Sequence, residues 1–498
     1  MLRLQSVISY RWVRLVITLL LLVGTRAQAQ RPNWQTAMLL GGEKSNIHVQ
    51  ATTADANGNV YIAGYFDETA RFGSFSLTSA GGSDVFVAKW SAGRFVWAQG
   101  AGGAKEDQAR AIAVDGTSVY ITGDFDSPAA LFGTEKLNPN DGSVDVFIAK
   151  VTDVGANASF TWAERAGGKA IDRAAGIAVT GANVYVVGNF LSRSADFGSN
   201  RLSNAGNGDV FITKLTDVGG KGKFIWAQRA GGSLFDYAAA VVAQGVNVYV
   251  AGGFGSGTAA FGSFSLANAV PAGNGVLPDV FVTKLTDVGS SANFAWAQRA
   301  GGTGNDAATG IAISGVNVFV TGSFDSPTAS FGPITLTSKN LNDVFVAKLL
   351  DNDPTFIWAL RGGGTGDDAA TAIAVNGSNL YLTGTFNSPV ADFGRHVLKH
   401  DDEGKPKLGD LFVVKLQDGG SSAQFTWAEK AVNTQGLAAA IQGSSIYIAG
   451  NTQAPVNFGK QYISAIGGGS GSFLASFTDV VVQPRRPPGS RTRRRGHR

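Results

Sequence analysis

Short apolar runs separated by glycine-bearing turns recur along most of the chain. In one stretch the run 175–179 is followed by a turn at 180–182 and by a second run at 183–188. Runs of this length, rich in β-branched residues and bounded by glycine, are typical of two β-strands joined in a hairpin. Small residues alternate along the first run, which favours a crowded position where strands converge. The pattern therefore predicts an all-β chain built from hairpins.

Each hairpin is followed by three further elements in a constant order. A connection containing Phe-Gly comes first, and we expect it to form an extra turn or short hairpin that packs on its own repeat unit. A third strand of the type Asp-Val-Phe-Val-Ala-Lys follows, as at 209–214. After a turn at 216–220, a fourth strand carries an aromatic residue and a tryptophan two positions apart, as at 224–227. One unit is thus a four-stranded antiparallel blade.

Tryptophan marks the fourth strand of each copy. The spacing between these tryptophans is about 64 residues, which indicates an internal repeat with variation in its loops. The seven repeat anchors are Trp34, Trp97, Trp162, Trp226, Trp296, Trp358 and Trp427.

The first and last copies are incomplete in complementary ways. The fourth-strand phrase around Trp34 has no unit before it, whereas the last unit ends at 472–478 with no fourth strand after it. An open ring would leave unpaired backbone donors and acceptors at the join. We therefore predict one domain, residues 30–480, that is a seven-bladed β-propeller of four-stranded antiparallel blades. The N-terminal strand around Trp34 is expected to complete the last blade.

The repeat resembles a known family. Its signature is Gly-Gly-Xaa3-Asp, then Ile-Ala-Val and Val-Tyr-Val-Thr-Gly, then Phe-Gly and Asp-Val-Phe-Val-Ala-Lys. These motifs are similar to the SBBP repeat, a seven-bladed β-propeller repeat of secreted bacterial proteins, over roughly residues 31–479. The resemblance implies the fold and an exported location, and it brings no shared catalytic residues. Relatives often continue into a domain for type IX secretion, whereas 480–498 here does not resemble one.

Composition agrees with many short strands. The chain has 67 Gly and 31 Phe but only 2 Met, and charged residues make up 16%, which suits tight turns better than helices. There is no Cys, so disulfides, thiolate metal sites and cysteine nucleophiles are excluded.

The first 29 residues are predicted to be a signal peptide. Three arginines precede the apolar run 15–23, and Ala27-Gln28-Ala29 has the small-Xaa-small form that a signal peptidase accepts. The alternative, an uncleaved anchor, is disfavoured because the run is about half of the ~20 residues that a span needs. We expect an exported protein in the periplasm, on the cell surface or outside the cell.

Basic charge is concentrated at the two ends. The formal net charge is +4 and the pI about 9.1, yet the leader holds four Arg and the segment 481–498 seven. The body between them is therefore acidic, which argues against nucleic acid as a partner. We expect the tail 481–498 to be disordered, with adhesion to anionic envelope polymers as the alternative.

One acidic position recurs in the loop that enters the inner strand. In a propeller this loop lies at the mouth of the central channel, so the carboxylates are expected to form a partial ring there. Such a ring could hold a hard cation such as Ca²⁺ or attract a cationic ligand. The alternative, favoured by five-fold repetition, is that each Asp caps its own Gly-Gly loop. The candidate positions are Asn46, Asp107, Asp172, Asp236, Asp306 and Asp368, and copy seven has Leu437 there.

Two histidines offer a weaker metal candidate. His396 and His400 precede the acidic run 401–403 and could share a metal if that segment were helical. Gly394, Gly404 and Pro406 favour a loop, so we interpret the segment as solvated charge and predict neither a metal nor a cofactor.

These features predict a non-catalytic binding or scaffold module. The repeat is nearly uniform, and a catalyst needs a polar constellation that differs from the repeat somewhere. The partner would be an extracellular protein or glycan bound at the channel-mouth face, mostly by the long connections 253–278 and 385–409, and the protein is expected to be a monomer. Two alternatives remain open: a polysaccharide hydrolase or lyase that uses acids of the mouth ring, and a structural element of the cell surface.

Overall fold

The structure is a computed structural model that describes residues 32–41, 46–139, 142–270, 277–400, 409–453, 455–464 and 470–479. Every regular element in these ranges is a β-strand. The predicted signal peptide and the basic tail lie outside the described residues. Across those same ranges, no helix is long and apolar enough to cross a membrane.

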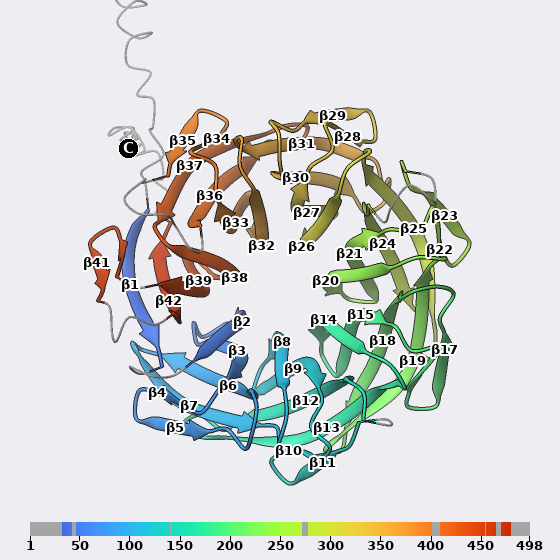
Figure 1. The fold of residues 1–498 in the computed structure, drawn as a ribbon, viewed down its shortest axis with the longest axis vertical. Coiled ribbons are helices and arrows are strands. Elements are labelled where there is room, and N and C mark those ends of the chain that lie inside the picture. The colour runs from blue at the N-terminus through green and yellow to red at the C-terminus, as the bar shows by residue number, and fades with distance from the viewer. Residues whose placement is uncertain are drawn as a thin grey trace, which may run out of the picture. The chain divides into compact units, whose positions relative to one another are not determined.

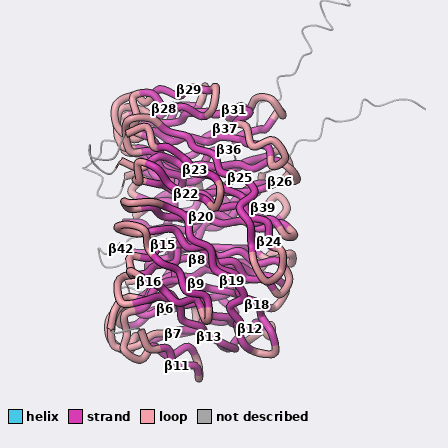
Figure 2. The backbone as a smooth tube through the Cα atoms, turned by 90° about the vertical axis from the view of Figure 1, so that its right-hand side faces the viewer, coloured by secondary structure: helices cyan, strands magenta, loops and turns pink. Residues whose placement is uncertain are grey.

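The strands form seven four-stranded antiparallel blades arranged around a channel (Figure 1), which confirms the predicted propeller. Each blade begins with an inner strand, and each inner strand contacts the inner strands of its two neighbours until the last contacts the first. The strands cross the thickness of the ring, and the turns gather on its two faces (Figure 2).

The seven blades have the following strands, from the channel outward. Blade 1 has β2 (Ile47–Ala54), β3 (Val60–Phe66), β6 (Asp84–Ser91) and β7 (Arg94–Ala101), and blade 2 has β8 (Asp107–Asp115), β9 (Ser118–Phe125), β12 (Asp145–Asp153) and β13 (Ala158–Gly168). Blade 3 has β14 (Asp172–Thr180), β15 (Asn183–Phe190), β18 (Asp209–Val218) and β19 (Lys221–Gly231), and blade 4 has β20 (Asp236–Gln244), β21 (Asn247–Phe254), β24 (Asp279–Asp287) and β25 (Ala292–Gly301). Blade 5 has β26 (Asp306–Ser314), β27 (Asn317–Phe324), β30 (Asp343–Leu350) and β31 (Phe356–Gly363), and blade 6 has β32 (Asp368–Asn376), β33 (Asn379–Phe386), β36 (Asp410–Asp418) and β37 (Ala423–Ala431). Blade 7 has β38 (Thr434–Gln442), β39 (Ser445–Gln453), β42 (Ser470–Thr478) and β1 (Asn33–Leu40).

Blade 7 is assembled from both ends of the chain. Strand β1 pairs antiparallel with β42 along its whole length, from Asn33 opposite Thr478 to Leu40 opposite Ser472. The predicted closure by the N-terminal strand is therefore confirmed. The pairing also places the blade's outer edge on β1, so no separate element is needed to cover β42.

The register corrects the expected equivalence of Trp34 with the other anchors. Trp34 lies opposite Phe477, and Thr36 lies opposite Ser476 across a bulge. In blade 1 the corresponding pairs are Phe95 with Trp90 and Trp97 with Lys89. Trp34 therefore takes the place of the phenylalanine of the motif, and Thr36 takes the place of the tryptophan. The spacing in the sequence agrees with this register, because Ala37 and Gly41-Gly42 match Ala227 and Gly231-Gly232 when Trp34 is aligned with Phe224.

The Phe-Gly connection forms a two-stranded hairpin in every unit. The hairpins are β4–β5 (Thr69–Phe72, Phe75–Thr78), β10–β11 (Ala130–Phe132, Glu135–Leu137), β16–β17 (Ser194–Phe197, Asn200–Ser203), β22–β23 (Thr258–Phe261, Phe264–Ala267), β28–β29 (Thr328–Phe331, Ile334–Thr337), β34–β35 (Val390–Phe393, His396–Lys399) and β40–β41 (Val456–Phe458, Gln461–Ile463). The glycine after each phenylalanine has a positive φ, such as 61° at Gly198, which a tight hairpin turn requires.

The prediction that this connection packs on its own unit is only half right. The Phe197 ring does lie against Phe211 and Phe224 of its own blade. Its backbone, however, pairs with Ala166 in the outer strand of the preceding blade. The hairpin therefore bridges two blades, and Gly41 N–H donating to the Arg71 carbonyl at 3.2 Å repeats this contact where β1 meets unit 1. The reason is that the outer strand of the preceding blade offers an unpaired edge to the hairpin.

The core is divided among the junctions between blades. In the described residues seven clusters of buried apolar side chains occur, and each joins two adjacent blades. The cluster at the join of blades 7 and 1 includes Leu40 and Leu474 on one side and Val49 and Phe86 on the other. Burial of this kind is the main favourable term in folding, so each blade is stabilised chiefly by its neighbours.

A buried polar clamp accompanies six of these junctions. At the join of blades 3 and 4, Asp287 accepts bonds from Lys214 Nζ at 2.6 Å, Tyr185 Oη at 2.8 Å and Trp226 Nε1 at 3.1 Å. Its side chain is 4% exposed and that of Lys214 6%. The clamp acids lie at the end of the third strand and reach back to the preceding blade; in chain order they are Asp153, Asp217, Asp287, Asp351, Asp418 and Asp479.

Candidate functional site

The five loop acids do not line the channel mouth. Asp107, Asp172, Asp236, Asp306 and Asp368 are all fully buried, with 0% exposed surface. The expected ring of solvent-facing carboxylates is therefore wrong. A hydrolase or lyase that used these acids would find no accessible carboxylate oxygen, and the described residues contain no cluster of three His, Asp or Glu side chains that could hold a metal.

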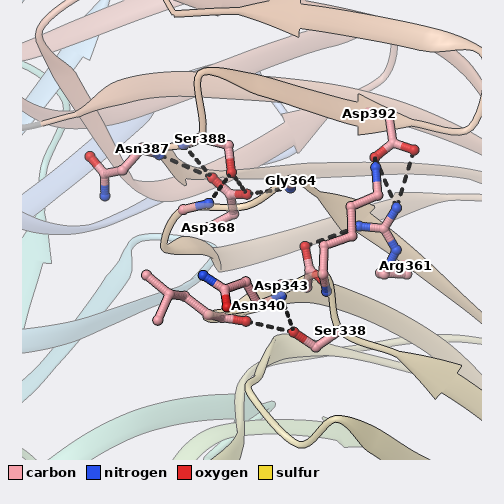
Figure 3. Close-up of polar contacts among 12 residues, drawn as sticks. Ser338, Asn340, Asp343, Arg361, Gly364, Asp368, Asn387, Ser388 and Asp392 are labelled. Carbon is pink, nitrogen blue, oxygen red and sulfur yellow. Dashed lines mark hydrogen bonds and ion pairs between the residues drawn. The ribbon is translucent and has the colours of Figure 1, made fainter.

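Each loop acid instead holds its own loop to the end of the second strand. Asp368 accepts bonds from Gly364 N–H at 2.7 Å, Ser388 N–H at 3.1 Å, Asn387 N–H at 3.0 Å and the Ser388 hydroxyl, as Figure 3 shows. This is the structural capping role. Burial raises the pKa of these carboxyl groups, to about 6 at Asp107, although the bonds from Ser127 oppose the increase.

The strand register shows which residues take the place of the loop acid in blades 1 and 7, which lack it. Asp107 lies opposite Phe125, and the residue in the same place in blade 1 is Ile47, opposite Phe66. Asn46 is therefore one position away and exposed. In blade 7 the place is taken by Thr434 rather than by Leu437.

A second acidic position, at the start of the third strand, is also structural. Arg361 donates to Asp343 at 3.0 Å and to Asp392 at 2.8 Å (Figure 3), so it ties its blade to the hairpin of the next unit. Equivalent arginines pair with Asp145, Asp209 and Asp279. These acids are completely buried and belong to the scaffold.

The histidine pair does not form a shared site. His396 begins β35 and its Nε2 lies 3.3 Å from the Phe425 carbonyl oxygen. His400 lies past the end of the same strand, and its Nδ1 is 3.1 Å from Asp410. The segment is a hairpin strand and not a helix, so the spacing of four residues sends the two rings to different partners. The acidic run 401–403 lies outside the described residues.

The distinctive site is a hollow at the end of the channel where the inner strands begin. Its volume is about 470 Å³, within the range of small-molecule sites. The side chains that line it come from blades 1 to 4 and from the loop before β20. Its polar and aromatic lining residues are Gln50, Arg110, Arg173, Asn189, Phe235 and Tyr237.

Two arginines share one carboxylate at this mouth. Arg110 donates to Asp124 at 2.8 Å through Nε and to Gln108 at 2.8 Å through a terminal nitrogen. Arg173 Nε lies 3.6 Å from the same Asp124 and its side chain is 49% exposed. Asp124 is 6% exposed and balances only one of the two cations. Because Asp124 fixes Arg110 in place, the hollow has one rigid and one solvent-facing guanidinium.

Aromatic pairs lie on either side of the arginines. On blade 4, Phe235 and Tyr237 are stacked with ring centroids 5.7 Å apart and planes inclined by 28°. On blade 1, His48 and Tyr65 are stacked at 4.6 Å and 19°. Burial lowers the pKa of His48, against an opposing effect of Asp67, so this ring is neutral at pH 7. Burial also raises the pKa of Tyr237, which keeps the phenol protonated.

Blades 5 and 6, across the mouth, carry small side chains at the same two positions of the inner strand, whereas blade 7 carries Gln435 and Leu437. Arg110 corresponds to Thr309 in blade 5 and Thr371 in blade 6. Thr309 donates to the Ala370 carbonyl at 2.8 Å and Thr371 to that of Gly436 at 2.6 Å. These hydroxyls are used between adjacent inner strands, whereas the arginines project into the hollow. The mouth therefore departs from the repeat on one side.

Next to the hollow, the channel itself encloses a smaller space. Its volume is about 240 Å³, and alanine, isoleucine, valine and threonine residues from all seven inner strands dominate its wall. Gln50, Ala175 and Ala239 line both spaces, so the hollow opens directly onto the channel.

Sequence reasoning missed this site because it searched for acids and histidines at repeated positions. The informative positions were those at which the residue type differs between copies of the repeat. One residue after the loop acid, the chain has Arg173 and Tyr237 in blades 3 and 4 but Ala307 and Ala369 in blades 5 and 6. Alignment of the copies on the loop acid would have exposed these outliers.

The long connections contribute less to the mouth than expected. Most of the described part of 253–278 forms β22–β23, which pairs with outer strand β19 of the preceding blade. The connection at 385–409 likewise forms β34–β35 against β31. The expectation that they form most of the binding surface is therefore wrong for these hairpins, which lie at the rim, while residues 271–276 and 401–408 lie outside the described ranges.

Comparison with known proteins does not assign the chain to a family. No family model matches it. It is 28% identical over 368 residues to the regulatory protein FlaEY of Caulobacter vibrioides, covering 69% of this chain and 37% of that protein. The chain thus spans little more than a third of the length of this relative.

Solved structures with related folds are distant. The Neurospora crassa Pan2 WD40 domain is 8% identical with a TM-score of 0.43, covering 88% of this chain and 90% of that one. The quinohemoprotein alcohol dehydrogenase of Comamonas testosteroni is 10% identical with a TM-score of 0.44, covering 91% and 77%. Sqt1 of Chaetomium thermophilum is 8% identical with a TM-score of 0.43, covering 90% and 99%.

Proposed function

We propose that the protein is an exported binding or scaffold module that takes its partner at the mouth of blades 1 to 4. One observation carries this proposal: the inner-strand positions that face the mouth hold Arg110, Arg173 and Tyr237 in blades 2 to 4, where blades 5 and 6 hold only alanine or threonine. A scaffold alone gives no reason for such a departure. Exposed arginine and half-buried aromatic side chains around a hollow are the usual composition of binding sites.

Export and family membership are part of the same proposal. The leader 1–29 has the pattern of a secretory signal, and the repeat is similar to the SBBP repeat of secreted bacterial proteins. We assign the chain to that repeat family and to the periplasm, the cell surface or the medium. A protein or glycan of the envelope would be the partner. The name of the relative FlaEY, a regulatory protein, is compatible with a role exerted through binding.

A capture experiment tests the proposal. The purified protein is immobilised, exposed to envelope and culture fractions with and without EDTA, and compared with the triple variant Arg110→Thr, Arg173→Ala and Tyr237→Ala. These replacements copy residues that blades 5 and 6 already carry at the same places. Because they leave the buried Asp124 without its two arginines, circular dichroism must first show that the variant is folded. We expect the triple variant to lose the captured partner.

The matched control alters the opposite face. Val154, Val218 and Val288 are exposed in the turns after the third strand, and their replacement by Ser should leave capture intact. Equal capture by the wild type and the triple variant would overturn the proposed site. If only the valine variant lost the captured partner, the binding site would lie on the opposite face.

A further inference from the structure

We infer that the hollow recognises a carboxylated sugar, as part of an acidic polysaccharide or a shorter acidic oligosaccharide. This inference rests on the proposed function and names the chemistry of its ligand. It follows from three features that line the hollow together on blades 1 to 4: an uncompensated cation, a stacked aromatic pair and two amide side chains.

The charge of the lining selects an anion. Among the described residues that line the hollow there are two arginines and no acidic side chain. Asp124 is buried beside them and accepts from Arg110, so one positive charge remains. Arg173 makes only the 3.6 Å ion pair and donates no hydrogen bond within the described structure. Its planar fork is therefore free to bind a carboxylate through two parallel bonds.

The aromatic pair favours an anionic group that is carried on a sugar ring. Tyr237 and Phe235 lie next to Arg173 in the lining of the hollow, and Tyr237 rests across Gly253, where a β-carbon would lie 2.8 Å from its ring. Glycine thus leaves the space that lets Tyr237 lie flat. The face of an aromatic ring is negative and attracts the weakly positive C–H groups of a sugar ring.

The remaining lining residues suit hydroxyl groups. Gln50 and Asn189 have amide side chains that both donate and accept, which matches neighbouring hydroxyls, although Gln50 also bonds to Tyr65. The rest of the wall is Ala174, Ala175, Ala238 and Ala239. Alanine methyl groups leave no deep apolar pocket of the kind that anchors a peptide side chain, whereas a flat ring can lie against them. A sugar is therefore favoured over a peptide carboxylate.

The direct test is titration of the purified protein with defined uronic acid oligosaccharides. The probes are tetramers of galacturonate, of mannuronate and of alternating glucuronate, each beside its methyl-esterified, uncharged form. We expect at least one acidic tetramer to bind, its ester to bind at least roughly tenfold more weakly, and rising salt to weaken the acidic form alone. Arg173→Gln should weaken binding by roughly ten- to a hundredfold, since a charge-assisted bidentate pair is lost.

Two further variants separate the contributions. Tyr237→Leu keeps the apolar volume but removes the ring face, and should weaken acidic and esterified tetramers alike by about tenfold. Arg201→Gln is the matched control, because Arg201 is an exposed arginine on the outer hairpin β16–β17, paired with Asp196. It should leave affinity unchanged.

The outcomes distinguish this inference from the proposed function. Failure of every acidic tetramer to bind, equal binding of acid and ester, or unchanged affinity in Arg173→Gln would each overturn the acidic-sugar assignment. If capture by the mouth nevertheless persists, the proposed function stands with a protein or neutral partner. Cleavage of a tetramer during titration, detected as new oligosaccharides by mass spectrometry, would overturn the non-catalytic part of the proposal and retain the ligand class.

Discussion

Six junctions of the ring are built alike, and the seventh is different. At the junction of blades 3 and 4, the buried clamp acid Asp287 accepts from a lysine, a tyrosine and a tryptophan of the preceding blade. At the junction of blades 7 and 1, the equivalent lysine and tryptophan positions hold Ser476 and Thr36, and the acid position holds Ala92. The seventh junction is therefore held by apolar contacts and neutral hydrogen bonds.

The seventh junction compensates with other contacts. Within blade 7, Thr36 and Ser476 bond to each other at 2.7 Å. Across the junction, Trp90 of blade 1 lies edge-on to Tyr447 of blade 7 with centroids 6.3 Å apart. Ser472 accepts from Val49 N–H at 2.9 Å and donates to the Ile47 carbonyl at 2.7 Å. The comparison shows that a clamp is one solution among several. Its absence here leaves β1–β42 pairing as the step that holds the two ends of the chain together.

Deletion of the closing strand should have the largest effect. Removal of residues 31–42 takes away β1 and exposes the edge of β42 and the apolar face of blade 7. We expect the ring to open and the single cooperative thermal transition to be lost or shifted by well over 10 °C. Circular dichroism melting measures this. Removal of 484–498 serves as the control, and equal effects of the two deletions would refute closure through β1.

Removal of one clamp acid should rank next. Asp287→Ala leaves Lys214 as a buried, unpaired charge together with two unsatisfied donors, and breaking such a pair costs about 3–5 kcal/mol of unfolding free energy. Urea denaturation of the variant measures the loss. Asp196→Ala removes an acid from an exposed pair and should leave the midpoint unchanged. A small loss for Asp287→Ala would mean that the clamps are not the difference between the junctions.

The stability that this clamp contributes should fall at low pH, whereas the contribution of the seventh junction should not depend on pH. Burial alone raises the pKa of Asp287, but bonds from Lys214, Tyr185 and Trp226 outweigh burial and hold the pKa below its usual value. The unfolded state therefore takes up the proton first as the pH falls, so the stabilisation is complete above the unfolded pKa of about 3.8 and is lost below it.

The measurement is the difference in unfolding free energy between the wild type and Asp287→Ala at pH 7 and at pH 3. We expect this difference to shrink at pH 3, whereas the difference for Thr36→Ala at the seventh junction should stay constant. Asp107 should act oppositely, because its raised pKa of about 6 makes the folded state retain a proton between pH 6 and 4; its contribution falls as pH rises through that window. If the difference in unfolding free energy between the wild type and Asp287→Ala were the same at pH 7 and at pH 3, Asp287 could not be the charged acid of the clamp.

The smallest effect is expected at the seventh junction. Thr36→Ala removes a half-buried, neutral hydrogen bond to Ser476, which is worth about 1 kcal/mol. Urea denaturation at pH 7 measures it beside Asp287→Ala. If Thr36→Ala lost as much unfolding free energy as Asp287→Ala, the neutral bond would stabilise the fold as strongly as the ion pair. The two kinds of junction would then not differ in strength.

The sequence was most informative where it repeats. The four-strand pattern, the count of seven and the split last blade all followed from phased motifs, and β1 beside β42 confirms them. The phase of Trp34 was assigned wrongly because it was matched to the other tryptophans by residue type, although its spacing to Gly41-Gly42 gives it the phenylalanine position. The hairpins were expected, but their backbone partner in the preceding blade is a long-range pairing that has no local signal.

The candidate site illustrates the limit of the same reasoning. Repeated acids such as Asp172 stood out in the sequence, and the structure buries them as loop caps. Arg110, Arg173 and Tyr237 did not stand out, since they lie on three different blades and are separated by about 64 residues each. Only closure of the ring brings their inner strands together around one hollow.

By itself, the sequence determined the all-β class, the blade, the number of blades and the way the chain closes, because these depend on period-two patterning and short-range turns repeated seven times. The tertiary structure alone decided which polar groups are buried and which meet at the mouth. The physical reason is that burial and proximity depend on the packing of neighbouring blades: the same strand end buries Asp172 between bonded loops and, one residue later, points Arg173 into the open hollow.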